Sequence, residues 1–135
     1  MKEIYSFSKE EKLCSKIDID NLFKTKGRNL ASYPFFFNFR IIDSEQKQPL
    51  PKLVFLVSKR KFKKAVDRNR VKRMCRELYR LRKPLFLKDL DLLENKELHL
   101  CIGYMPNEIL EYTKLQKGFY KALKVLINEI KKPLS

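Results

Sequence analysis

The chain has 135 residues, 44% of them hydrophobic, and its 31 Lys and Arg against 16 Asp and Glu give a net charge of +15. This length suits one domain with one modest core, and the hydrophobic content excludes a disordered chain. Charge of one sign opposes compaction, so the excess predicts a polyanionic partner: nucleic acid first, and an anionic membrane surface second. No apolar run is long enough for a transmembrane helix.

The N-terminus and the cysteines indicate the compartment in which the protein works. Residues 1–12 are polar and include acids, unlike a signal peptide, and we expect a flexible or extended segment there. Cys14, Cys75 and Cys101 are odd in number, widely spaced and without a C-x-x-C pair. They predict neither a disulfide framework nor a zinc site, and we expect reduced thiols in a cytoplasmic protein.

The first predicted elements are a short helix and two strands. Ser15-x-x-Asp18 has the form of a capping box, which predicts a helix over residues 16–26 that ends at Gly27. A short strand over residues 29–32 then precedes a longer, aromatic strand over residues 33–42. Alternation places Phe35, Phe37, Phe39 and Ile41 on one face of the longer strand and Phe36, Asn38 and Arg40 on the other.

A polar loop and a further strand follow. Residues 43–51 are polar and contain two prolines, which predicts a loop. Residues 53–58 form an apolar run that predicts a buried strand. We expect the strands over residues 33–42 and 53–58 to be antiparallel neighbours, because they follow each other along the chain.

A long basic helix comes next. Residues 59–83 contain 13 basic and two acidic residues, so this segment carries most of the net charge. At about 100° per residue, one side of the helix collects Val71, Met74, Cys75, Leu78 and Leu81, and most of the opposite side is covered by Asn69, Arg70, Lys72, Arg73, Arg76, Arg80 and Lys83. We expect the helix to begin near Lys64, after a lead-in loop over residues 59–63, and to end at Pro84.

The last third of the chain predicts a connection, a strand and a helix. Residues 85–96 are mixed, residues 97–105 have the pattern of a strand, and residues 112–130 form an amphipathic helix. Its core stripe is Leu115, Phe119, Ala122, Leu123, Leu126, Ile127 and Ile130. The predicted order is α-β-β-β-α-β-α, an α+β fold in which three helices pack with one small mixed sheet.

The basic helix has the chemistry of a phosphate-binding surface. Arginine offers planar, forked donors that match phosphate oxygens and also stack on bases. Asn69 lies among the arginines, where its amide either bonds to a base edge or a phosphate or serves as a local cap. The alternative is a merely solvated helix, although ordinary solvated faces mix both signs of charge.

Two stretches of sequence resemble the signature of the ribonuclease P protein family. They are Ser58-Lys59-Arg60 at the end of a strand and Ala65-Val66-Asp67-Arg68-Asn69-Arg70-Val71-Lys72-Arg73 on the basic helix. In the family, a strand ending in S-K-K or A-K-K precedes a helical A-V/H-x-R-N-R-x-K-R. The pattern of Leu13, Asp18, Ile19, Leu22, Phe23 and Gly27 is also similar, so the resemblance covers residues 7–130.

The resemblance implies a fold and an activity. The fold would be a single RNA-binding domain over residues 1–135, ribosomal-protein-S5-like, with a left-handed β-α-β crossover where general physics favours a right-handed one. The activity would be that of a ribonucleoprotein endoribonuclease whose RNA, with bound Mg²⁺, removes the 5′ leader of precursor transfer RNA. The implied partners are ribonuclease P RNA, one to one, and precursor transfer RNA, with no membrane, no obligate protein partner and no protein-bound cofactor.

Carried over residue by residue, the resemblance predicts two binding sites and no catalytic or metal-binding residue. The contacts to the catalytic RNA would be Arg68, Asn69, Arg70, Lys72, Arg73 and Arg76, with Lys59 and Arg60 before them. The 5′ leader would bind Ile19, Phe23, Phe36, Asn38, Leu56 and Ser58. Aromatic side chains beside cations suit a single strand, although Phe36 and Ile19 would equally suit a buried core.

This chain departs from the family at the leader site. Val54 and Leu56 are bulky where small residues are usual, Asn38 replaces a common aromatic residue, and Ile19 replaces a usual Phe. These departures concern the cleft and leave the match on the basic helix intact.

Other function classes have less support. A general RNA-binding protein of the ribosomal type is the main alternative. A nuclease made of protein alone is disfavoured, because the one histidine, His99, lies in an apolar strand and Asp89, Asp91 and Glu94 lack metal-ligand spacing. A zipper-type DNA reader would need a heptad repeat after Lys83, and membrane binding would need the apolar stripe that the core uses.

Overall fold

The computed structural model describes residues 28–47, 49–90 and 94–131. Its elements are β1 (Arg28–Ser32), β2 (Phe35–Asp43), β3 (Lys52–Leu56), α2 (Ala65–Asp89), β4 (Lys96–Tyr104) and α3 (Tyr112–Lys131). This order confirms the α+β class and the expected sequence of elements from residue 28 onward. The helix expected over residues 16–26 and the segment 1–12 lie outside the described residues.

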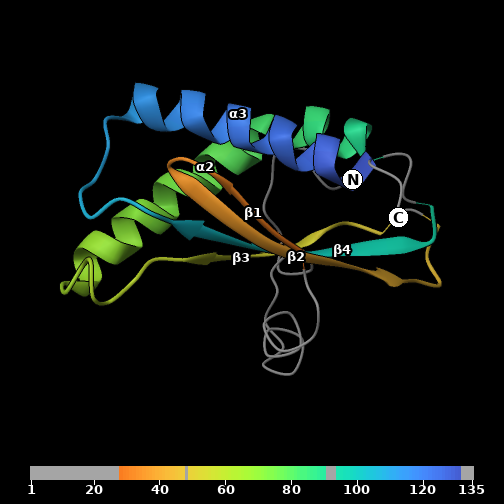
Figure 1. Ribbon diagram of the computed structural model, residues 1–135, viewed down its shortest axis with the longest axis horizontal. Helices are drawn as coiled ribbons and strands as arrows, with labels where there is room; N and C mark the ends of the chain where they lie inside the picture. The colour runs from red at the N-terminus through yellow and green to blue at the C-terminus, as the bar shows by residue number, and fades with distance from the viewer. Residues whose placement is uncertain (1–27, 48, 91–93, 132–135) are drawn as a thin grey trace.

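The strands form one mixed sheet in the order β1-β2-β4-β3 (Figure 1). β2 is antiparallel to β1 and to β4, whereas β3 is parallel to β4, and α2 connects these two parallel strands. The expectation that β2 and β3 are neighbours is therefore wrong, because the crossover through α2 places β4 between them. β4 has the composition of a central strand, since residues 98–104 are buried on both faces of the sheet.

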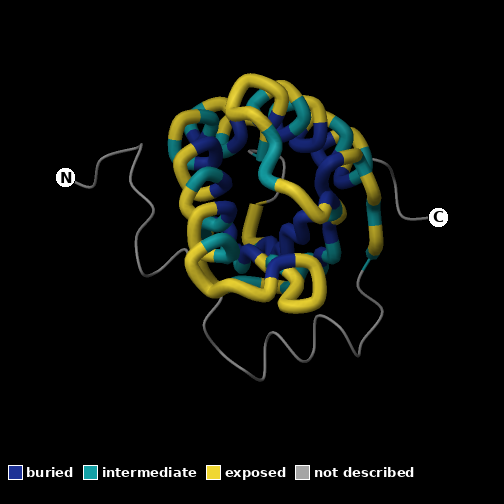
Figure 2. Tube along the Cα trace, turned by 90° about the vertical axis from the view of Figure 1, so that its left-hand side faces the viewer, coloured by how far each residue is buried: buried dark blue, intermediate teal, exposed yellow. Residues whose placement is uncertain are grey.

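The hydrophobic core lies between one face of the sheet and the two helices α2 and α3 (Figure 1). Phe35, Phe37 and Phe39 of β2 are at most 1% exposed, and the rings of Phe35 and Phe119 meet edge to face with 5.3 Å between centroids. Every core residue predicted for α3 is buried: Leu115, Phe119, Ala122, Leu123, Leu126, Ile127 and Ile130. Figure 2 shows the buried parts of the elements facing inward and the exposed parts facing solvent.

α2 begins at Ala65, near the expected position, but it does not end at Pro84 and continues to Asp89. Proline inside a helix lacks an N–H donor and crowds the preceding turn, which is why an end was expected there. The turns beyond Pro84 are anchored by Phe86, which is 2% exposed and meets the ring of Tyr79 edge to face at 5.9 Å. Burial of this aromatic pair offsets the cost of the proline, so residues 85–89 are helical rather than a loose connection.

The buried stripe of α2 also differs from the predicted one. Val71, Cys75 and Leu78 are buried as expected, but Leu81 is 41% exposed. Lys83, expected on the solvent side, is only 3% exposed. At about 100° per residue, position 81 falls roughly a third of a turn from the middle of the buried stripe, whose C-terminal part is formed by Tyr79, Lys83 and Phe86.

Neither α2 nor α3 is long and apolar enough to cross a membrane, and no other helix is present in the described part of the chain. The seven core residues of α3 are buried rather than on an outer surface. The helices therefore serve the core with one side and leave the other side charged.

Burial should make two thiols unreactive. Cys75 and Cys101 are free and buried, and loss of hydration raises the pKa of each thiol to about 12. We predict that neither thiol is alkylated by iodoacetamide in the folded protein at about pH 8, because the reactive thiolate is scarce well below the pKa. Mass spectrometry of the peptides should find both modified only after unfolding in guanidinium; rapid labelling of either thiol in the folded chain would contradict the described burial.

Candidate nucleic-acid interface

The solvent side of α2 carries the arginine-rich motif. Because Val71, Cys75 and Leu78 are buried, the residues on the other side of the helix face outward. Asn69, Arg70, Arg73 and Arg76 are exposed and Lys72 is half-buried; these residues are called the α2 basic surface. The structure thus places five of the predicted RNA contacts on one rigid element.

The arginines of the α2 basic surface are not neutralised by acidic side chains among the described residues. Arg80, one turn further on, is paired with Glu77 at 2.5 Å, and this hydrogen bond holds the pKa of the Glu77 carboxyl below its ordinary value. Within residues 28–47, 49–90 and 94–131, no ion pair involves Arg70, Arg73 or Arg76. An external anion is therefore the natural counterion for these three side chains.

Arg68 has a different arrangement from its neighbours in the motif. Its Nη1 donates hydrogen bonds to the main-chain carbonyls of Phe62 at 2.7 Å and Lys63 at 3.1 Å. The side chain is half-buried and points back toward the loop that precedes α2. Arg68 thus ties the first turn of the helix to this loop, a contact that the motif alone did not indicate.

The loop before α2 presents two further predicted RNA contacts, Lys59 and Arg60, both exposed. Ser58 shapes the loop, because its hydroxyl accepts a hydrogen bond from the Arg60 N–H at 3.1 Å and its carbonyl accepts one from the Phe62 N–H at 3.0 Å. Phe62 is 7% exposed and packs on the ring of Tyr104. The loop is therefore held in shape while its charged side chains reach solvent.

The face of the sheet opposite α2 and α3, called the far sheet face, is organised in three cross-strand rows. The rows are Ala31, Phe36, Gly103 and Leu56; Asn29, Asn38, Cys101 and Val54; and Arg40, His99 and Lys52. They are respectively apolar, amide-containing and basic. Three residues predicted for leader binding, Phe36, Asn38 and Leu56, come together on this face, and Phe36 and Leu56 are 38% and 37% exposed.

Phe36 lies flat on the backbone of Gly103. A Cβ atom at position 103 would come within 1.9 Å of the Phe36 ring, so only glycine leaves room for the ring in this position. Beside it, Oδ1 of Asn38 is buried and has no hydrogen-bond partner in the part of the chain that is described. An unsatisfied buried acceptor is costly, so a ligand that brings an N–H or O–H donor to Asn38 gains from the contact.

A hydrogen-bonded chain orients the basic row. Nη2 of Arg40 donates to Nδ1 of His99 at 3.2 Å, and Nε2 of His99 donates to Oε2 of Glu97 at 2.6 Å. Because a guanidinium only donates, Nδ1 is the nitrogen of His99 without a hydrogen. His99 and Glu97 thereby position Arg40, an arrangement that sequence reasoning missed although alternation along β4 puts His99 on the same face as Cys101.

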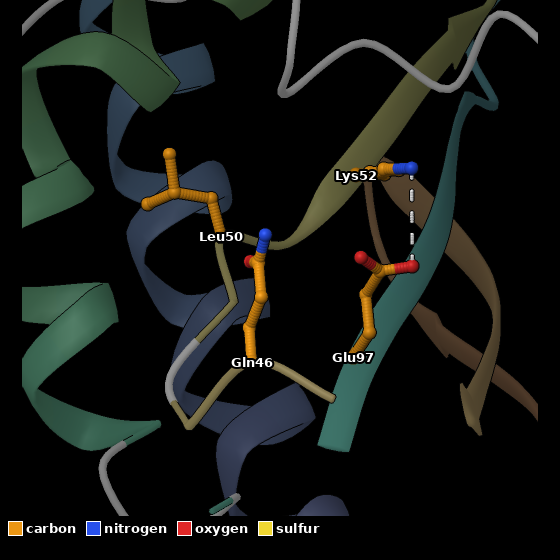
Figure 3. Close-up of a pocket in the computed structure, with 4 residues that line it drawn as sticks. All are labelled: Gln46, Leu50, Lys52 and Glu97. Carbon is orange, nitrogen blue, oxygen red and sulfur yellow. Dashed lines mark ion pairs between the residues drawn. The ribbon is translucent and has the colours of Figure 1, made fainter. Parts of the chain in front are cut away.

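A small open pocket lies beside this network and is lined by Gln46, Leu50, Lys52 and Glu97. Figure 3 shows Lys52 and Glu97 facing each other from β3 and β4, with 3.9 Å between Nζ and Oε2. Gln46 and Leu50 come from the loop between β2 and β3. The acid and the base offset each other, so the pocket itself has little net charge with which to attract a phosphate.

Of the remaining predicted site residues, Ile19 and Phe23 lie outside the described residues. Ser58 follows β3, and its hydroxyl is engaged by the loop as described above. The described residues of the two predicted sites thus lie in different places: the exposed residues of the α2 basic surface are on the helix side of the sheet, and Phe36, Asn38 and Leu56 are on the far sheet face.

Comparisons with known proteins agree on one family. Residues 7–99 match the family described as Ribonuclease P. The ribonuclease P protein component of Porphyromonas gingivalis is 31% identical over 121 residues, which is 88% of this chain and 85% of the relative. That of Dictyoglomus thermophilum is 33% identical over 90 residues, covering 67% of this chain and 70% of the relative.

Solved structures of two proteins share the fold. The RNase P protein of Staphylococcus aureus superposes with a TM-score of 0.61 at 22% identity, covering 86% of this chain and 94% of that one. The RNase P protein of Thermotoga maritima superposes with a TM-score of 0.61 at 21% identity, covering 85% of this chain and 96% of that one.

The role of Arg68 in holding the loop is testable. We predict that Arg68→Ala lowers the free energy of unfolding by about 1–3 kcal/mol, because two carbonyls lose a charged donor. Trypsin should then cut faster after Lys59 and Arg60 in the folded protein. Arg70→Ala is the matched control and should change neither property, since Arg70 is exposed. Equal stability and equal cleavage in the two variants would contradict this role.

Proposed function

Because the chain belongs to the ribonuclease P protein family, we propose that it is the protein subunit of a ribonucleoprotein endonuclease that removes the 5′ leader of precursor transfer RNA. RNA binding and the processing of transfer RNA precursors follow from the family. The α2 basic surface carries the proposal, because three outward arginines without an ion pair to any described residue form a surface for phosphates.

The α2 basic surface contacts the RNA subunit in this proposal. Arg70, Arg73 and Arg76 supply forked donors to phosphate oxygens, and Lys72 adds a fourth charge. Asn69 lies between the arginines, where its amide can bond to a base edge or a phosphate. Lys59 and Arg60 extend the contact along the loop, which Arg68 holds in place through its bonds to main-chain carbonyls.

The far sheet face takes the single-stranded leader. A base stacks on the exposed Phe36 ring, which rests on Gly103, and Leu56 widens this apolar floor. A donor on a neighbouring base satisfies Oδ1 of Asn38. Arg40, oriented by His99, lies on the same strand two residues further on and is placed for the backbone phosphate. Ile19 and Phe23 are proposed to complete this site.

Hydrolysis belongs to the RNA subunit in this account. In this proposal the RNA binds the Mg²⁺ that supports hydrolysis, as membership of the family implies. The protein acts by positioning: it binds the catalytic RNA with one side and the substrate leader with the other. One protein per RNA, without another protein partner or a membrane, suffices for this division of labour.

The proposed function is tested by reconstitution. The protein is mixed with ribonuclease P RNA and a precursor transfer RNA at moderate Mg²⁺, and release of the 5′ leader is measured. We expect faster cleavage than with RNA alone.

Arg70→Ala should weaken binding to the RNA subunit and lower the slope of log affinity against log salt by roughly 0.9, because one phosphate contact is lost.

Three results would count against the proposal. If the protein did not accelerate cleavage, the alternative of a general RNA-binding protein of the ribosomal type would be favoured. An unchanged salt slope in Arg70→Ala would place this arginine outside the RNA interface. Leader release by the protein without RNA would instead assign the chemistry to protein side chains.

A further inference from the structure

α3 carries a second basic surface that the ribonuclease P signature does not include. From residue 114 onward its exposed positions are Lys114, Lys117, Lys121, Lys124, Asn128 and Lys131; the five lysines are called the α3 lysine row. At about 100° per residue these positions fall within an arc of roughly 100°, directly opposite the core stripe. The row extends over about 25 Å of helix axis.

No interaction with another described residue explains why the lysines of the α3 lysine row are gathered on one side of the helix. No acidic side chain interrupts it, and no ion pair joins any of its lysines to a described residue. Lys117 and Lys121 are four residues apart and the flanking lysines three apart, so neighbouring like charges repel and destabilise the helix. A solvated helix face ordinarily mixes both signs of charge, and this one does not.

The chemistry of the row indicates its partner. A lipid surface is disfavoured, because an interfacial helix must insert an apolar face into the lipid, and the apolar stripe of α3 from Leu115 to Ile130 is at most 6% exposed and packed in the core. A protein partner is disfavoured, because the row contains no aromatic or aliphatic anchor and lysine is depleted from protein interfaces. A row of point charges on a rigid helix suits a sugar–phosphate backbone read without regard to sequence.

The position of α3 indicates which of the two RNAs the α3 lysine row would contact. α2 and α3 lie on the same side of the sheet and contact each other (Figure 1). The guanidinium of Arg82 on α2 lies over the ring of Tyr120 on α3, 4.5 Å from the ring centroid. An RNA that lies on the α2 basic surface therefore continues toward α3. The far sheet face, proposed for the leader, is on the other side. We propose that the α3 lysine row is a second contact for the phosphate backbone of the RNA subunit, an inference that rests on the proposed function.

The test removes the charges and then restores them. Lys117→Gln/Lys121→Gln/Lys124→Gln should weaken binding to ribonuclease P RNA at least about tenfold near physiological salt and lower the salt slope by about two to three. The matched Lys117→Arg/Lys121→Arg/Lys124→Arg protein should keep wild-type affinity and slope. Thermal unfolding of the Gln variant should not occur below the wild-type temperature, because like-charge repulsion has been removed.

One control tests whether the effect depends on the position of the lysines rather than on net charge. The other tests whether it concerns the RNA subunit rather than the substrate. Lys121→Gln and Lys47→Gln each remove one charge from an exposed lysine, and only the first should reduce the slope. The Gln triple variant should bind isolated precursor transfer RNA as the wild type does. The inference about the α3 lysine row would be overturned if the Gln triple variant bound the RNA subunit with wild-type affinity and salt slope. It would also be overturned if only binding to precursor transfer RNA were weakened. Neither result would affect the proposed function. Failure of the wild-type protein to bind ribonuclease P RNA would instead overturn the proposed function.

Discussion

Burial of one side of α2 against the sheet is the constraint on which the two candidate surfaces depend. Val71, Cys75 and Leu78 are at most 2% exposed, and a helix turns by about 100° per residue. Asn69, Arg70, Arg73 and Arg76 are consequently directed to solvent on a rigid element. Because α2 and α3 both cover the same side of the sheet, they also leave Phe36 and Leu56 exposed on the far sheet face. The fold thus separates the arginines of α2 from the aromatic, amide and basic rows of the far sheet face.

The features that could be predicted from the sequence are those that follow from the side-chain repeat of a strand or a helix. Alternation along β2 correctly divided Phe35, Phe37 and Phe39 from Phe36 and Asn38, because a strand has a side-chain period of two. The helical period correctly identified the whole core stripe of α3. The exposure of the arginines followed from the same reasoning. Local pattern is sufficient here because each element has one clearly apolar side.

The parts that could not be predicted depend on contacts between distant residues. Nothing local to Pro84 shows that Phe86 is anchored against Tyr79, and without that anchor the proline would end the helix. The place of β4 between β2 and β3 depends on a crossover, which neighbouring patterns do not encode. The bonds of Arg68 to the carbonyls of Phe62 and Lys63 and the chain from Arg40 through His99 to Glu97 are likewise matters of side-chain geometry. They change how the site is understood, because Arg68, His99 and Glu97 act by positioning other groups.

The central claim is that the two sides of the sheet bind two different RNAs, and site-directed crosslinking tests it most directly. Cys14 is replaced by serine, a single cysteine is introduced by Arg73→Cys or Phe36→Cys, and benzophenone is attached to it; Cys75 and Cys101 are too buried to compete. In the complete complex with ribonuclease P RNA and precursor transfer RNA, the probe at position 73 should crosslink to the RNA subunit. The probe at position 36 should crosslink to the 5′ leader. Crosslinks from both positions to the same RNA would contradict the account.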